Sequence, residues 1–224
     1  MGNCPVAKTF GEPAKDQPSV LLVNGSPHEF GCTFTALNEV AMELKKLGVN
    51  ASIFQIGTQP IGGCVACGGC RHNGGECVFD QDVVNRCAKA MREADGIIVG
   101  SPVYYAGPNG QLTSLLDRIF FANGRFLAFK PASAVVSCRR GGASATYDRL
   151  LKYFEKSNMP IVTSQYWNSV HGNSPDEVRQ DKEGLQTMRT LARNMAWLLK
   201  CIKHAEGVVP YPEYEPFEGT NFIR

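Results

Sequence analysis

The sequence predicts a parallel, doubly wound α/β sandwich built on a five-stranded sheet. Short runs of β-branched and apolar residues alternate along the chain with segments whose apolar residues recur at helical spacing. The short runs are apolar at nearly every position, as strands are when helices cover both faces of a sheet. No internal repeat and no linker divides the chain, so a single domain is expected. Ligands of such sheets bind at the carboxyl ends of the strands.

Five strands and five helices are expected in alternation. In the first helix, Leu37, Val40 and Leu44 form one apolar stripe and Gly48 is the stop signal, while Asp82 is the candidate N-cap of the second. The expected strands are residues 19–26, 49–56, 96–102, 132–138 and 160–167. The expected helices are residues 33–48, 82–95, 110–122, 144–156 and 176–204.

The two ends of the chain differ from this pattern. Residues 1–18 have no apolar core like that of a signal peptide, and we expect a disordered or irregular extension there. The domain is expected over residues 19–204, and residues 205–224 are expected to be an irregular tail. No run of eighteen apolar residues occurs, so no membrane span is expected. These features predict a cytoplasmic protein.

Charge and cysteine content narrow the class of partner and the compartment. Lys and Arg number 23 against 21 Asp and Glu, and no basic stripe occurs, so no nucleic-acid partner is expected. Nine cysteines without a secretory signal indicate a reducing compartment rather than a disulfide framework. Five cysteines are scattered and four are clustered within fourteen residues, so only the cluster needs a special explanation.

The loop after the first expected strand is suited to an anion. Residues 24–35 (NGSPHEFGCTFT) bring small and hydroxyl residues to the start of a helix, where backbone N–H groups and the helix dipole favour a phosphate. The loop lacks the lysine of a nucleoside-triphosphate loop and the glycine pattern of a dinucleotide site. A monophosphate is the best fit. Taken alone, the same residues also fit a plain capped turn.

Two further strands are followed by loops suited to a flat heterocycle. After the third strand, Pro102 stiffens the chain, Tyr104 and Tyr105 offer aromatic faces, and Gly107 permits close approach of a ligand. After the fourth strand, residues 137–145 (SCRRGGASA) place a Gly-Gly turn behind two arginines. Each loop alone has an ordinary packing or turn-forming explanation, but all three loops follow strands of one sheet and converge on one crevice.

The residues of the first and second loops resemble those of a known protein family. Residues 24–37 and 95–118 (DGIIVGSPVYYAGPNGQLTSLLDR) strongly resemble the NADPH-dependent FMN reductase family, flavodoxin-like proteins that bind FMN, and the similarity runs from about residue 19 to residue 201. The resemblance implies a flavodoxin-like fold and an FMN site on the three loops. The implied FMN contacts are Ser26, His28, Cys32 and Thr33 for the phosphate, Pro102, Val103, Tyr104, Tyr105, Ala106 and Gly107 for the isoalloxazine, and Ser137, Arg139, Arg140, Gly141 and Gly142 in the third loop.

The clustered cysteines follow the second strand. Residues 64–77 (CVACGGCRHNGGEC) resemble the iron–sulfur flavoproteins, a branch of the same family, which implies a [4Fe–4S] cluster on Cys64, Cys67, Cys70 and Cys77. Four thiolates are the ordinary ligands of such a cluster, and the glycines between them let the backbone curl around it. Two alternatives remain open at this point: free or redox-active thiols lining the flavin pocket, and a zinc ion.

The resemblance implies an oxidoreductase that takes electrons from NAD(P)H through FMN to a small-molecule acceptor, such as a quinone, a flavin or a nitro- or azo-aromatic compound. The chemistry belongs to the flavin N5 atom, so no protein residue is expected to be catalytic. The alternative is an electron carrier that accepts electrons from a ferredoxin-like donor. The resemblance and the aromatic tail (Tyr211, Tyr214, Phe217, Phe222) also predict a homodimer or homotetramer.

Overall fold

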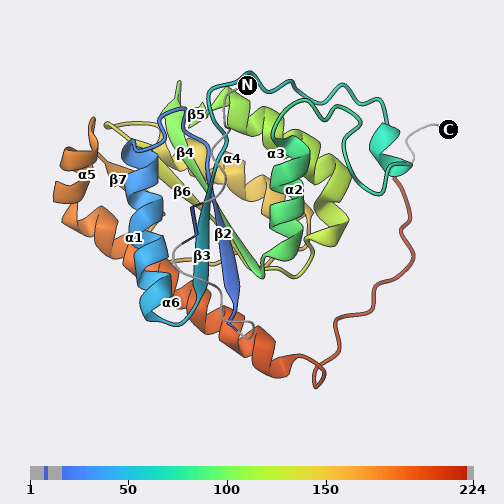
Figure 1. Ribbon diagram of the computed structural model, residues 1–224. Helices are drawn as coiled ribbons and strands as arrows, with labels where there is room; N and C mark the ends of the chain where they lie inside the picture. Colours follow the sequence, from blue (N-terminus) through green and yellow to red (C-terminus); the bar gives the residue numbers. More distant parts are fainter. Residues whose placement is uncertain (1–7, 10–16, 221–224) are drawn as a thin grey trace.

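The computed structural model describes residues 8–9 and 17–220, and its centre is a single twisted sheet (Figure 1). The strands are β1 (Lys8–Thr9), β2 (Ser19–Asn24), β3 (Asn50–Gln55), β4 (Gly96–Tyr104), β5 (Gly107–Pro108), β6 (Ala132–Cys138) and β7 (Ser169–His171). Their order is β1-β3-β2-β4-β6-β7, and β5 pairs with β4. All pairs from β3 to β7 along this order are parallel, which confirms the predicted doubly wound sheet.

Helices cover both faces of the sheet. They are α1 (Cys32–Lys46), α2 (Val84–Glu93), α3 (Gly110–Asn123), α4 (Ala143–Lys156), α5 (Pro175–Gln180) and α6 (Lys182–Ala205), with short 3₁₀ helices η1 (Gly69–Arg71) and η2 (Gly124–Phe126). The apolar residues of α1 and α6 form one core with one face of the sheet. The apolar residues of α2, α3 and α4 form a second core with the other face. Burial on both faces explains why the central strands are apolar throughout.

The fifth parallel strand lies later in the chain than predicted. Residues 160–167 are apolar only at their start, and their only β-pairing is an isolated bridge between Ile161 and Ala132. The carbonyl of Val162 accepts a hydrogen bond from the Ser133 hydroxyl at 2.8 Å. Tyr166 and Trp167 are exposed. The predicted strand is therefore wrong, and β7 at residues 169–171 takes its place beside β6.

The long C-terminal helix is two helices. Asp181 separates α5 from α6, and its Oδ1 atom accepts a hydrogen bond from the backbone N–H of Gly184 at 2.9 Å, which caps α6. Its Oδ2 atom accepts another from the backbone N–H of His171 at 2.7 Å. The carboxylate thus fixes a helix start against the end of β7, a role that helical periodicity does not reveal.

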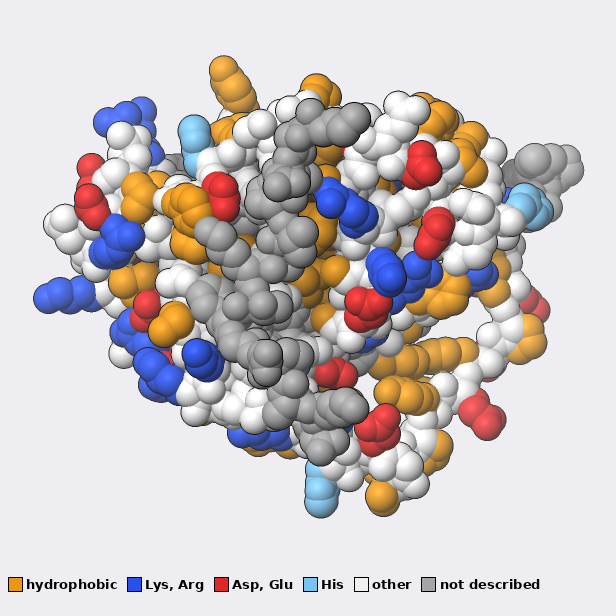
Figure 2. Space-filling model, in the orientation of Figure 1, with side chains coloured by type: hydrophobic (Ala, Val, Ile, Leu, Met, Phe, Trp, Pro, Cys, Tyr) orange, Lys and Arg blue, Asp and Glu red, His pale blue; other side chains and the backbone are white. Residues whose placement is uncertain are grey.

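Described residues near both ends of the chain contact the rest of the domain. Lys8 and Thr9, in the extension expected to be irregular, pair antiparallel with β3. The tail leaves the end of α6, and its rings of Tyr211 and Tyr214 lie 4.8 and 6.2 Å from the ring of Phe129. Phe217 is exposed, and Figure 2 shows hydrophobic side chains along this tail at the right of the view. Phe222 lies outside the described residues. Among the residues that are described, no helix is long and apolar enough to cross a bilayer.

Candidate functional site

The first loop ends on a helix start with free backbone donors. Gly31 is the N-cap of α1 and provides no side-chain hydrogen bond, and the first turn of α1 contains no acidic residue. The first N–H groups of a helix have no partner within the helix, and the helix dipole attracts negative charge to them. This donor set fits a phosphate. The loop before it is fixed by Gln55, whose Nε2 atom donates to the carbonyl of Ser26 at 2.7 Å.

The residues implied for the phosphate divide into buried and exposed groups. Ser26 and Thr33 are buried, Cys32 is half-buried and His28 is exposed. The Ser26 hydroxyl accepts a hydrogen bond from the backbone N–H of His28 at 3.1 Å. The Thr33 hydroxyl lies 2.8 Å from the Ser137 hydroxyl, so it links the first loop to the third. Burial raises the pKa of the Cys32 thiol, which therefore stays protonated at neutral pH.

The second loop is the tight turn between β4 and β5. Tyr105 and Ala106 have φ angles of 50° and 58°, and Tyr104 pairs with Gly107 across the turn. Two successive residues with positive φ form the hairpin turn that normally uses Asn-Gly. A tyrosine and an alanine in this conformation cost about 1–3 kcal/mol each, and such strain gathers at ligand sites. The Tyr105 side chain is fully exposed.

The third loop contacts the tip of this hairpin. Gly142 has a φ of +89°, and a Cβ atom there would lie 2.7 Å from the Cα atom of Ala106 and 2.9 Å from a methyl group of Val103. Gly142 is also the N-cap of α4, which has no side-chain cap. Only glycine adopts this positive φ without strain and also fits against Ala106 and Val103 without a clash. Arg139 and Arg140 precede it and are exposed.

The three loops therefore meet at the carboxyl ends of β2, β4 and β6. The Thr33–Ser137 contact joins the first to the third, and the packing of Gly142 on Ala106 joins the third to the second. They combine a helix start free for a phosphate, exposed aromatic faces and a second helix start. These features fit FMN, whose phosphate and flat ring need such partners.

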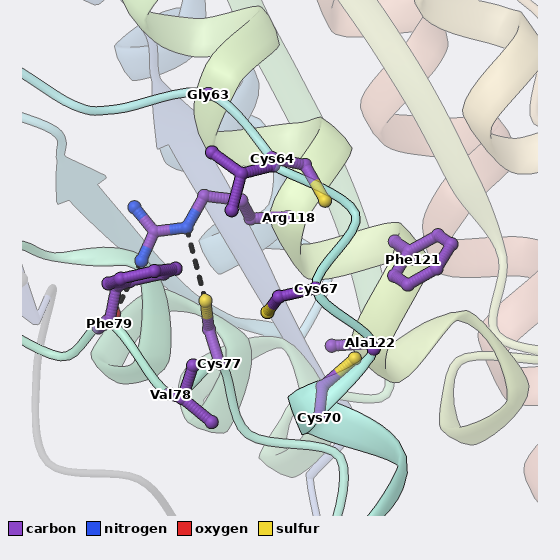
Figure 3. Close-up of a pocket in the computed structure, with 12 residues that line it drawn as sticks. Gly63, Cys64, Cys67, Cys70, Cys77, Val78, Phe79, Arg118, Phe121 and Ala122 are labelled. Carbon is purple, nitrogen blue, oxygen red and sulfur yellow. Dashed lines mark hydrogen bonds between the residues drawn. The ribbon is translucent and has the colours of Figure 1, made fainter.

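The four clustered cysteines occupy the long loop after β3. Cys64, Cys67, Cys70 and Cys77 line one small pocket, together with the C-terminal half of α3 (Figure 3). Gly68, with a φ of 72°, turns the chain into η1 between the second and third cysteine. Cys64 and Cys67 are exposed and the other two are half-buried. The spacing of the cysteines thus brings four thiols from one loop to one pocket.

Arg118 holds both ends of this loop. Its side chain is 3% exposed and comes from α3. Its Nη1 atom donates to the carbonyl of Gly62 at 3.3 Å and forms an ion pair with Asp82, and its Nη2 atom donates to the carbonyl of Phe79. Its Nε atom donates to the Sγ atom of Cys77 at 3.3 Å, as Figure 3 shows. One buried cation therefore ties the start of the loop to its end.

The charge of Arg118 is maintained by these partners. Burial disfavours the charged guanidinium, but the hydrogen bonds with Asp82 and Cys77 outweigh this effect and raise the pKa of Arg118.

The role of Asp82 differs from the prediction. Asp82 is not the N-cap of α2, which is Val83, although its Oδ1 atom accepts a hydrogen bond from the Val84 N–H. Arg118 was not predicted as a functional residue, because its only signal in the sequence is its position in the residues that resemble the family.

The thiol pocket is displaced from the three loops. Helix α3 begins at Gly110, directly after the second loop, and Arg118 and Ala122 follow eight and twelve residues later. At 1.5 Å per residue, they lie about 12 and 18 Å along the helix. In the described part of the chain, no three His, Cys, Asp or Glu side chains are grouped closely enough to hold a single metal ion.

A comparison with protein families gives one match that spans most of the chain. The model of the NADPH-dependent FMN reductases matches residues 18–174. The chain belongs to this family. It is therefore a flavin oxidoreductase of the FMN type, as the resemblance implied.

Curated relatives and solved structures agree with this assignment. An iron–sulfur flavoprotein of Methanocaldococcus jannaschii is 31% identical over 192 residues, which cover 82% of this chain and 98% of that protein. An iron–sulfur flavoprotein of Methanosarcina thermophila is 29% identical over 187 residues, covering 81% and 95%. Similar folds occur in RosB (TM-score 0.67, 13% identity, 92% of this chain and 98% of that one) and in a WrbA-like flavodoxin from Agrobacterium tumefaciens (0.58, 16%, 83% and 98%). The fold is flavodoxin-like.

Proposed function

We propose that this protein binds FMN on the three loops and a [4Fe–4S] cluster on Cys64, Cys67, Cys70 and Cys77, and that it transfers electrons between a donor and an acceptor. The observation that carries the proposal is that four thiols of one loop line one pocket beside α3. The names of the curated relatives, which are iron–sulfur flavoproteins, support it.

The residues around the thiols fit a cluster. Four cysteine thiolates are its usual ligand set, and a hydrogen bond to a ligand sulfur adjusts its potential. Arg118 supplies such a bond to Cys77 and brings a positive charge beside it. That charge would offset part of the negative charge of four thiolate ligands in a pocket that is otherwise lined by apolar side chains such as Val65, Phe79 and Phe121.

We propose NAD(P)H as the electron donor and a small molecule, such as a quinone, a free flavin or a nitro- or azo-aromatic compound, as the acceptor. FMN, when bound, supplies hydride chemistry at N5 and can also exchange single electrons. The protein would bind and orient it: the start of α1 would hold the phosphate, and the hairpin at Tyr104–Gly107 and the turn at Gly142 would contact the ring. The family assignment supports the nicotinamide step.

Protein purified without oxygen tests the proposal. We expect about four irons and four acid-labile sulfides per chain. Heating should release FMN, identified by chromatography, and adding NADPH anaerobically should bleach its absorption. Fewer than about two irons per chain contradicts the cluster, since a cubane needs four. Recovery of FAD, or of no flavin, contradicts the FMN site. One zinc per chain without sulfide would mean that the four cysteines bind zinc and not a cluster.

A second candidate function is that of an electron carrier fed by a ferredoxin-like protein. Exposed apolar side chains surround the thiol pocket, namely Val65, Val78, Phe79 and Phe121. Exposed apolar side chains gathered in one place are typical of a protein docking site. In this case reduced ferredoxin, but not NADPH, reduces the flavin. Equal or faster reduction by NADPH contradicts the carrier.

We further propose a homodimer or homotetramer in the cytoplasm. The exposed aromatic residues of the tail support the first part, because Tyr211 and Tyr214 remain 65% and 64% exposed beside Phe129 and Phe217 is 94% exposed. Cysteines that remain free support a reducing compartment. Sedimentation at micromolar concentrations tests the assembly, and a strict monomer contradicts it.

A further inference from the structure

A groove distinct from the flavin loops lies beside the thiol pocket. It has a volume of about 890 Å³ and runs between α3 and α4, and Cys64 and Ala66 of the cysteine loop line one part of it. Cys64 and Phe121 line both this groove and the thiol pocket. Sites for small molecules are typically 300–1,000 Å³ in volume, so the groove is of that size.

The groove is strongly biased towards positive charge. Four cations line it, Arg125, Arg149, Lys152 and Lys156, against a single carboxylate, Asp117. Lys152 pairs with Glu155 at 2.6 Å and Arg149 lies 3.6 Å from Asp117. The charge favours an anionic ligand.

One of these cations is held in a fixed position. The Nη2 atom of Arg149 donates to the Tyr153 hydroxyl at 3.0 Å, and the guanidinium lies 4.5 Å from the centre of the Tyr153 ring. The Tyr153 hydroxyl in turn donates to Asp117. Burial, followed by the hydrogen bond with Asp117, raises the pKa of Tyr153, so the hydroxyl keeps its proton. A guanidinium fixed in this way keeps N–H groups free for a carboxylate or phosphate.

The groove also offers flat apolar surface. The rings of Phe120 and Tyr153 lie 5.2 Å apart, and Phe121 is exposed. A ligand with a flat body and an anionic group would satisfy both the rings and the cations. The concave shape argues for a small molecule rather than the flat face of another protein.

We propose that this groove binds a small aromatic anion, a carboxylate or a phosphate ester, with its charge on Arg149 and Lys156 and its ring on Phe120 and Phe121. A ligand in this groove lies beside Cys64, which is one of the four thiols assigned to the cluster. The relevance of this position to the cluster rests on the proposed function. The binding site itself follows from the groove.

Calorimetry with two matched probes tests the site. In protein saturated with FMN, 2-naphthoate should bind with a dissociation constant of about a millimolar or tighter. The neutral 2-naphthamide has the same ring and should bind about tenfold more weakly, because it lacks the charge. Raising the salt concentration should weaken only 2-naphthoate binding.

Variants locate the site. Arg149→Met should weaken 2-naphthoate about tenfold, and Lys156→Gln, which removes an exposed charge at the groove, about threefold. Lys200→Gln, on α6 at the opposite face of the sheet, should change nothing. Equal affinity for the two probes, no binding of either, or full affinity in both groove variants overturns the proposal. Cys67→Ser protein, whose iron content is measured separately, should bind 2-naphthoate as before, so loss of the cluster and loss of this site are distinguishable.

Discussion

The flavin loops and the thiol pocket are built in different ways. The three flavin loops are short turns at the ends of buried parallel strands, and their geometry comes from the register of the sheet. The thiol pocket belongs to a 28-residue connection between β3 and α2, with η1 as its only regular element. Its shape depends instead on side-chain contacts with α3, and above all on Arg118.

The two sites therefore depend on different parts of the molecule for their stability. The flavin loops remain in place as long as the sheet is folded, because each begins at a strand that is buried on both faces. The cysteine loop can lose its arrangement while the sheet stays intact, because few of its residues are buried. We therefore expect substitutions to separate the two sites, and the following predictions test that separation.

The largest expected effect is on the cysteine loop. Cys67→Ser should remove most of the bound iron and sulfide and leave FMN largely in place, because the ligands of a cluster act together whereas the flavin loops do not include Cys67. Iron, sulfide and flavin per chain are measured on protein kept from oxygen. Cys201→Ser, an exposed cysteine on α6, is the control and should keep both cofactors. Loss of FMN together with the iron would mean that the two sites depend on each other.

Arg118→Met should destabilise the protein by about 3 kcal/mol, because it leaves Asp82 without its buried cationic partner. The measurement is the free energy of unfolding in urea, combined with iron content and flavin content. We expect the iron content to fall more than the flavin content. The matched control is Arg92→Met, since Arg92 is more exposed and pairs with Glu76 of the same loop at 3.4 Å. That change should cost under about 1 kcal/mol. Equal effects of both changes would contradict the special role of Arg118.

Gly142→Ala should weaken FMN binding by about 1–3 kcal/mol, because alanine is strained at positive φ and its Cβ atom would contact Ala106. Iron content should not change. Gly110→Ala is the control, since its Cβ atom would meet nothing within 4 Å, its φ is not positive and it is not among the implied FMN contacts. Dissociation constants for FMN are measured by fluorescence titration of protein from which the flavin has been removed. Unchanged affinity in Gly142→Ala would show that the second and third loops need not meet to bind FMN.

The smallest expected effect is at the junction of the first and third loops. Thr33→Val keeps the side-chain shape but removes the hydroxyl that contacts Ser137, so FMN affinity should fall by about 1 kcal/mol. Thr35→Val lies on the same helix and removes a hydroxyl that donates to the Gly31 carbonyl at 3.1 Å. It should have less effect on FMN, since this bond lies within the first loop and the start of α1 and does not join the first loop to the third. An equal loss in both variants would indicate a general effect on α1 rather than the junction.

The local sequence determined the doubly wound sheet, most element boundaries and the grouping of four cysteines. Strands β2, β4 and β6 and helices α1, α3 and α4 begin within one residue of their predicted positions, because burial on both faces and helical periodicity are local signals. The three loops could be predicted for the same reason, since a parallel sheet brings the carboxyl ends of its strands to one edge.

Only the tertiary structure decided the features that depend on contacts between distant residues. The place of the fifth strand is set by the contacts of β7 with β6 and with Asp181, not by the apolar run at residues 160–162. The position of the thiol pocket, about 12–18 Å along α3, depends on Arg118, which lies 36 residues after Asp82 and 56 after Gly62 in the chain. The local sequence around one charged residue on a helix does not show whether its side chain is solvated or buried. The role of Arg118 in binding both ends of the cysteine loop therefore depends on how that loop folds against α3.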